Sequence, residues 1–152
     1  MRPRVAIVGD HESERRSGRA PLLLLHGGPG ACHDYIESIA DIAATGRRGI
    51  FYDQQGCGNS DDLGDPSLCT VDLYVSEVDA VRDALDLDRV HMLGQSWGGM
   101  LLMESLVRQP AGVVSATIAS SPAAIEVPSQ TRAPRPSPHG PRKGNRFGRH
   151  TW

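Results

Sequence analysis

Gly94-Gln95-Ser96-Trp97-Gly98 follows an apolar run at residues 90–93 and precedes a second one at residues 100–107. These runs predict a strand before the G-x-S-x-G sequence and a helix after it, which is the context that a nucleophile elbow requires. A serine on so sharp a turn leaves little room for its neighbours, and glycine fits there because it has no Cβ. The stretch therefore predicts that Ser96 is a nucleophile, raised above a sheet and able to attack a carbonyl carbon.

Length and composition predict one globular domain followed by a tail of different character. The chain has 152 residues, 39% of them hydrophobic, which suits a single domain with a core. All 18 Asp and Glu lie at or before Glu126, whereas residues 129–152 hold six of the 16 Lys and Arg. That last stretch also holds four prolines and has no apolar period. We expect a domain at residues 1–128 and a disordered tail at 129–152, whose abrupt change of composition suggests a shifted reading frame or a premature end.

Charge and hydropathy argue against nucleic-acid binding, a membrane-spanning segment and a secretory signal. The basic tail lacks interleaved aromatic side chains and any folded reader of nucleic acid. The longest aliphatic run, residues 22–25, is too short to span a bilayer, and the charged N-terminus is unlike a signal peptide. Cys32, Cys57 and Cys69 have neither the spacing of a disulfide framework nor that of metal ligands. We expect a cytoplasmic protein with reduced thiols and no metal site.

Hydrophobic periodicity predicts alternating strands and helices. Residues 9–20 are polar and predict a turn or loop, and the helix at 34–44 is expected to carry Tyr35 on its apolar face and to stop at Gly46. Thr70 is expected to cap the next helix. This alternation is typical of βαβ units and a mostly parallel sheet. Strands are expected at residues 4–8, 21–25, 49–52, 90–93 and 113–119, and helices at 34–44, 70–85 and 97–108.

A second glycine-rich loop, His26-Gly27-Gly28-Pro29-Gly30, follows the strand expected at residues 21–25. It is either a plain tight turn, a phosphate-binding loop or an oxyanion loop; the Gly-Lys-Ser/Thr of a phosphate loop and the G-x-G-x-x-G pattern are both missing from it. An oxyanion hole is built from the N–H of the residue after the nucleophile and an N–H from such a loop. We therefore expect the N–H groups of Trp97 and Gly28, in preference to Gly27, to form the oxyanion hole.

Three motifs together resemble the proline iminopeptidase family of α/β-hydrolases: HGGPG at residues 26–30, DQQGCGNS at 53–60 and GQSWGG at 94–99. The resemblance extends over roughly residues 5–127. It implies a partial α/β-hydrolase fold, with a mostly parallel sheet and helices on both faces. It also implies an aminopeptidase that removes an N-terminal proline, or a relative acting on amino-acid amides or small peptides. Members of the family use a Ser-Asp-His triad and need no metal or other cofactor.

The resemblance leaves the triad incomplete, because the family's acid, histidine and substrate-binding cap all follow the matched stretch. After Ser96 the only carboxylates are Glu104 and Glu126, and the only histidines are His139 and His150. Glu126 with either histidine would satisfy the chain order Ser, acid, His, but not the rigid placement that a general base needs. We expect a serine hydrolase impaired by truncation, and the alternative is a catalytically inactive fragment.

The remaining candidate residues are expected to be structural. His26 lies in the expected oxyanion loop, His33 at the start of a helix and His91 within a strand. Asp53 lies at a strand end beside glycines. The family resemblance implies that it braces the following loop and is not the triad acid.

Overall fold

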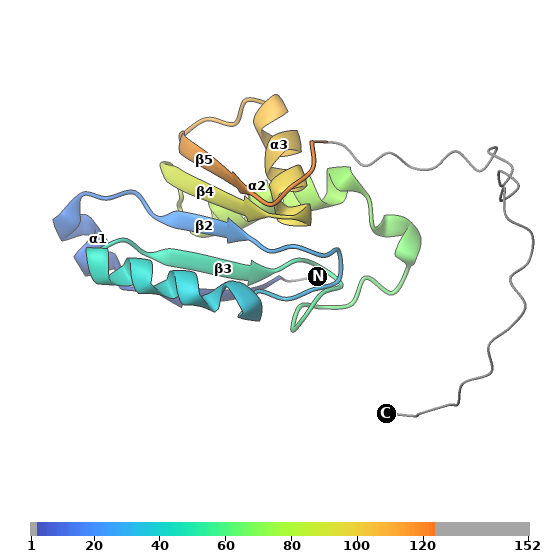
Figure 1. Cartoon of the computed structure of the whole chain (residues 1–152), viewed down its shortest axis with the longest axis horizontal. Coiled ribbons are helices and arrows are strands. Elements are labelled where there is room, and N and C mark those ends of the chain that lie inside the picture. Colours follow the sequence, from blue (N-terminus) through green and yellow to red (C-terminus); the bar gives the residue numbers. More distant parts are fainter. Residues whose placement is uncertain (1–2, 124–152) are drawn as a thin grey trace, which may run out of the picture.

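A single five-stranded sheet forms the centre of the molecule, whose computed structural model describes residues 3–123. The sheet order is β1-β3-β2-β4-β5. Strand β1 is antiparallel to β3, and the other neighbours are parallel, so Figure 1 shows β2 to β5 with their arrowheads at one end. The mostly parallel sheet is therefore confirmed. The strands are β1 (Arg4–Val8), β2 (Leu22–Leu25), β3 (Gly49–Asp53), β4 (Val90–Gln95) and β5 (Val113–Ala119).

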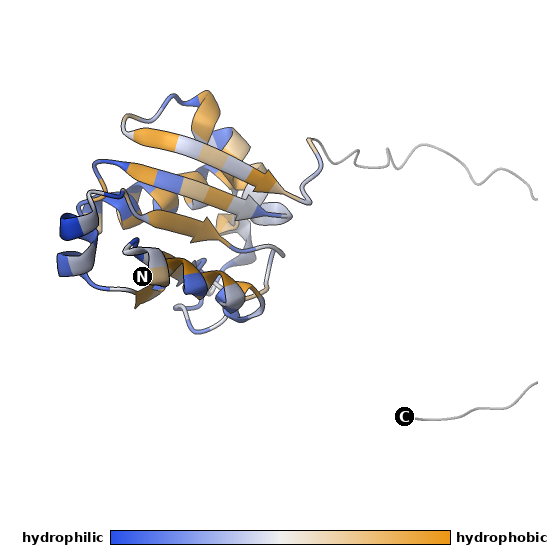
Figure 2. Ribbon diagram, turned by 60° about the vertical axis from the view of Figure 1, so that its left-hand side comes forward, coloured by the Kyte–Doolittle hydropathy of each residue, from blue (hydrophilic) through white to orange (hydrophobic). Residues whose placement is uncertain are grey.

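Helices cover both faces of this sheet, as expected. Side chains alternate along β2, so Leu23 and Leu25 join one core, and Leu22 and Leu24 join the other. Helices α2 (Val71–Ala84) and α3 (Trp97–Val107) pack on the first core, and the helix η1 (Asp34–Thr45) packs on the second. Much of the orange colouring that marks hydrophobic residues in Figure 2 lies on the strands. No helix within residues 3–123 is both long and apolar enough to cross a bilayer.

The helix boundaries follow local chemistry. Thr70 caps α2 through its side chain, which accepts a hydrogen bond from the Leu73 N–H at 3.2 Å. Gly46 ends η1 with φ of 77°, a left-handed conformation that suits glycine. The short helix η2 (Pro66–Leu68) precedes α2. The cap at Thr70 and the stop at Gly46 are thus confirmed.

Residues 9–20 contain a helix where the sequence predicted a turn or loop, so that prediction was wrong. Helix α1 (His11–Ser17) is capped by Asp10, whose carboxylate accepts a hydrogen bond from the Ser13 N–H at 2.8 Å. None of its residues is buried, which explains why no apolar period revealed it. Helix α1 is therefore supported by the Asp10 cap and by the ion pairs of Glu12 with Arg15 and Arg16, and not by a buried face.

The helix expected at residues 34–44 is present as η1, and it is a 3₁₀ helix. Its residues bond to carbonyls three positions back, as the Gly46 N–H does to Ala43 at 2.9 Å. Ile36, Ile39 and Ile42 are spaced three apart, so winding with three residues per turn aligns them on the second core. Tyr35, expected on this apolar face, is instead 52% exposed.

The last described strand forms an edge of the sheet. Within residues 3–123, β5 pairs with β4 alone, and its apolar side chains Val114 and Ile118 are each 43% exposed. The domain boundary expected at residue 128 and the tail from 129 onward lie outside the described residues, as do Glu126, His139 and His150.

Candidate active site

Ser96 lies on the turn between β4 and α3, in a strained backbone conformation with φ of 52° and ψ of −118°. Its N–H donates to the Ala119 carbonyl at 2.9 Å, and its own carbonyl accepts hydrogen bonds from Gly99 and Met100 in the first turn of α3. The predicted context of strand, sharp turn and helix is present. The turn places Ser96 at the carboxyl end of the parallel strands, where α/β sheets bind their ligands.

The glycines of the motif allow backbones to approach closely. A Cβ on Gly98 would lie 2.1 Å from the Leu25 carbonyl oxygen and 2.5 Å from that of His26. A Cβ on Gly94 would lie 2.3 Å from the Gly98 carbonyl oxygen. The first turn of α3 is therefore seated directly on the end of β2, and this contact brings the loop after β2 to Ser96.

The loop at residues 26–30 lies against the nucleophile turn. A Cβ on Gly27 would come within 3.1 Å of Ser96 Cβ. The Gly27 N–H is already engaged, since it donates to the Tyr35 hydroxyl oxygen at 2.5 Å. No hydrogen bond within the described chain uses the Gly28 N–H, and Trp97 begins α3, where N–H groups have no partner inside the helix. This arrangement supports the choice of Gly28 over Gly27.

Hydrogen bonds join the three sequence motifs into one unit. The Trp97 indole N–H donates to Gln54 Oε1 at 2.9 Å, and Gln54 Nε2 donates to the His26 carbonyl at 2.9 Å. The Gln54 backbone N–H donates to His26 Nε2 at 2.9 Å, so the proton of this ring resides on Nδ1, which faces the Gly27 carbonyl at 2.7 Å. Burial lowers the pKa of His26. His26 is therefore a neutral structural residue, as predicted.

Asp53 braces two loops at the end of β3. One of its carboxylate oxygens accepts hydrogen bonds from the His33 N–H at 2.9 Å and from His33 Nδ1 at 2.7 Å, and the other accepts from the Asn59 N–H at 2.9 Å. Burial alone would raise the pKa of Asp53, but the hydrogen bonds from Asn59 and His33 outweigh it and lower the pKa. Asp53 thus has the bracing role that the sequence predicted.

The other described histidines are also engaged away from the nucleophile. His91 Nδ1 lies 2.7 Å from Ser115 Oγ on β5, and His11 Nε2 lies 2.9 Å from the Arg48 guanidinium. Within residues 3–123, Ser96 Oγ makes no hydrogen bond to a histidine or a carboxylate. Glu104, in α3, is exposed.

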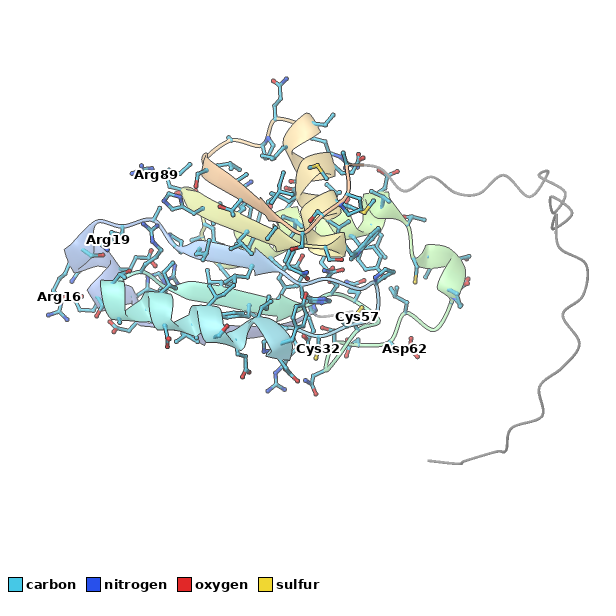
Figure 3. All side chains as sticks on the ribbon, in the orientation of Figure 1. Arg16, Arg19, Cys32, Cys57, Asp62 and Arg89 are labelled. Atoms are coloured by element: carbon cyan, nitrogen blue, oxygen red, sulfur yellow. The ribbon has the colours of Figure 1, made fainter. Side chains whose placement is uncertain are left out.

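A cavity of about 340 Å³ lies beside Trp97, between the loop after β2 and the loop after β3. Figure 3 shows Cys32 and Cys57 near the carboxyl end of the parallel strands. It shows Arg16, Arg19 and Arg89 at the opposite end of the sheet. Cys32, Cys57 and Cys69 form no disulfide within residues 3–123. The cavity is lined by Pro29, Gly30, Gly56, Cys57, Cys69, Tyr74 and Trp97.

Tyr35 and Glu77 hold loops of the candidate site in place, and the sequence analysis did not assign this role to either residue. The Tyr35 hydroxyl accepts from the Gly27 N–H and donates to Gln95 Oε1, both at 2.5 Å, and so ties η1 to the nucleophile turn. Glu77 on α2 is only 4% exposed; its Oε1 accepts from the Gln55 N–H at 2.9 Å, and its Oε2 has no partner in the described chain. Burial raises the pKa of Glu77 to about 7.

Glu77→Gln is expected to remove part of the pH dependence of stability. Unfolded Glu77 titrates near 4.5 and the folded residue near 7, so the folded state binds more protons between these values and loses stability as pH rises through them. Glutamine keeps an acceptor for Gln55 without the buried charge. The free energy of unfolding of the variant, relative to the parent, should therefore rise by about 3 kcal/mol between pH 4 and pH 8 in urea titrations. The exposed Glu104→Gln is the control, and a Glu77→Gln difference that is the same at both pH values would contradict the assignment.

Comparison with known proteins agrees with this architecture. The alpha/beta hydrolase fold family matches residues 20–148. The proline iminopeptidase of Lactiplantibacillus plantarum is 47% identical over 117 residues, 76% of this chain and 39% of the relative. The proline iminopeptidase of Lacticaseibacillus rhamnosus is 47% identical over 122 residues, 80% of this chain and 40% of the relative. The resemblance stated from the motifs is thus confirmed, and the chain spans about 40% of the length of these relatives.

Solved structures give the same result. The crystal structure of a proline iminopeptidase from Mycobacterium smegmatis superposes with a TM-score of 0.69 at 46% identity, over 79% of this chain and 40% of that one. The crystal structure of VinJ superposes with a TM-score of 0.72 at 36% identity, over 78% of this chain and 40% of that one.

Proposed function

Because the chain belongs to the α/β-hydrolase fold family, we propose that Ser96 is the nucleophile of a serine hydrolase of the proline iminopeptidase type. Its substrates would be small peptides with an N-terminal proline, or related amino-acid amides. The observation that carries the proposal is the strained Ser96 turn lying against the glycine loop at residues 26–30. Similarity to two bacterial proline iminopeptidases at 47% identity supports the substrate class.

In the proposed reaction, Ser96 Oγ gives up its proton and bonds to the carbonyl carbon of the N-terminal residue. The C–N bond to the next residue then breaks and the amine leaves with that proton, after which water hydrolyses the acyl-enzyme and restores the Ser96 hydroxyl. The oxygen that becomes negative is stabilised by the N–H groups of Gly28 and Trp97, which lie on the loop after β2 and at the N-terminus of α3. The positive end of the α3 dipole adds to this stabilisation. The bonds among Trp97, Gln54 and His26 hold both donors in place. The reaction needs no cofactor.

We further propose that the 152-residue chain alone is a slow catalyst. The four histidines within residues 3–123 are each bonded elsewhere, to Arg48, Gln54, Asp53 and Ser115. A serine without a general base keeps its proton and is a weak nucleophile. We also propose that the protein is cytoplasmic. The three free cysteines of the chain are consistent with that location.

Turnover of L-proline p-nitroanilide by the full chain tests this proposal. We expect kcat/KM at least about 10⁴-fold below that of an intact proline iminopeptidase, because triad loss leaves mainly the contribution of the oxyanion hole. Ser96→Ala should change this residual rate little. Rapid, saturable turnover that Ser96→Ala abolishes would show that a base reaches Ser96, and the slow-catalyst proposal would be wrong.

A further inference from the structure

A histidine and two carboxylates converge at the start of η1, where the histidine contacts Asp53 at the end of β3. His33 Nε2 lies 3.9 Å from Asp34 Oδ1 and 3.9 Å from Glu37 Oε1. One ligand atom from each of the three residues lies within 4.8 Å of the others. None of these residues takes part in the proposed hydrolysis, so the group needs an explanation of its own.

His33 is held in the orientation that a metal ligand needs. Its side chain is only 10% exposed, and its Nδ1 lies 2.7 Å from Asp53 Oδ1. A carboxylate only accepts hydrogen bonds, so Nδ1 carries a proton and donates it to Asp53. Histidines that bind metals typically donate their other ring N–H to a carboxylate in this way, which fixes the ring and makes it a better ligand. The Nε2 atom is thereby directed toward Asp34 and Glu37.

The contacts of Nε2 are too long for hydrogen bonds and suit an ion between the three groups. At 3.9 Å, neither carboxylate is within hydrogen-bond distance of Nε2. Ligand atoms about 2.1 Å from a tetrahedral metal are roughly 3.4 Å apart. The three ligand atoms lie within 4.8 Å of one another, so the group needs a closure of at most about 1.4 Å. Asp34 and Glu37 are free to make it, because their side chains are 65% and 66% exposed.

We propose that His33, Asp34 and Glu37 bind a first-row divalent cation such as Zn²⁺, with Asp53 supporting His33 from behind. Imidazole and carboxylate ligands together suit this class of ion, and water would complete the coordination. The cysteine spacing that argued against a metal has no bearing on this group, which contains no cysteine. The bound ion would fasten the first turn of η1 to Asp53, next to Tyr35 and the Gly27 loop. The proposal does not depend on the hydrolase function.

Zn²⁺ titration of the metal-free full chain by calorimetry tests the site. Glu37→Gln and the double variant Asp34→Asn/Glu37→Gln alter exposed side chains, so the fold should survive, and circular dichroism checks this. We expect each to weaken Zn²⁺ binding at least about tenfold, since even the loss of a supporting partner weakens metal binding by roughly 10- to 100-fold. Asp41→Asn, an exposed change on the same helix, is the matched control and should leave the affinity unchanged.

Co²⁺ provides a second readout that separates this site from thiolate binding at the cysteines. Its visible spectrum should indicate nitrogen and oxygen ligands, without a sulfur-to-cobalt charge-transfer band, and should be lost in the double variant. Zn²⁺ affinity that is the same in parent and double variant would overturn the proposal, as would the lack of any binding by the folded parent.

Discussion

Gly98→Ala is expected to destabilise the fold by more than about 3 kcal/mol, which is a large part of the stability of a small domain. The added methyl group would lie 2.1 Å from the Leu25 carbonyl oxygen and 2.5 Å from that of His26. Both are backbone atoms at the end of the buried strand β2, so neither can rotate away as a side chain would. Relief requires α3 to move off the sheet. Urea denaturation followed by circular dichroism measures the effect.

Gly18→Ala is the matched control for this prediction. Gly18 has φ of 65°, and a Cβ added there would have no atom within 4 Å outside its own chain neighbours. Alanine at this position adds only the strain of a left-handed backbone conformation. We therefore expect the free energy of unfolding to fall by about 1 kcal/mol. Equal losses in the two variants would mean that the close approach of α3 to β2 is not what requires glycine at residue 98.

The sheet could be predicted from the sequence because its information is local. The four leucines of β2 and the apolar runs of β4 and β5 are recognisable without knowing what they contact. Helix α1 could not be predicted in the same way, because it buries nothing and depends on the Asp10 cap. Only the pattern of Asp followed by Ser three residues later marks it, and turns share that pattern.

The motifs of the candidate site could be recognised in the sequence, but the long-range hydrogen bonds that join them could not. Ser96 and the loop containing Gly28 could be proposed as site residues from the sequence because the nucleophile turn constrains nearby residue types. The contact of Tyr35 with Gln95 spans 60 positions, and that of Trp97 with Gln54 spans 43. No local period encodes such pairs. The spacing of Glu77 places it on the buried side of α2 beside Val78, but a charged residue there contradicts the usual pattern and was not recognised.

We propose that Ser96 is the nucleophile of a proline iminopeptidase-type hydrolase. A chimera tests it in the presence of a complete triad. Residues 1–123 of this chain would be joined to the part of the Mycobacterium smegmatis proline iminopeptidase that follows the aligned region. The two chains are 46% identical where they superpose, so the α3 and β5 surfaces should accept the added part. Ser76→Ala, an exposed change on α2, is the control for Ser96→Ala.

The deciding measurement is kcat of this chimera on L-proline p-nitroanilide, with and without Ser96→Ala. We expect the chimera and its Ser76→Ala control to release p-nitroaniline at similar rates. Ser96→Ala should lower kcat by about 10⁶-fold, as removal of a catalytic serine does in a complete triad. Turnover by the folded chimera that persists unchanged after Ser96→Ala would contradict the assignment of Ser96 as the nucleophile.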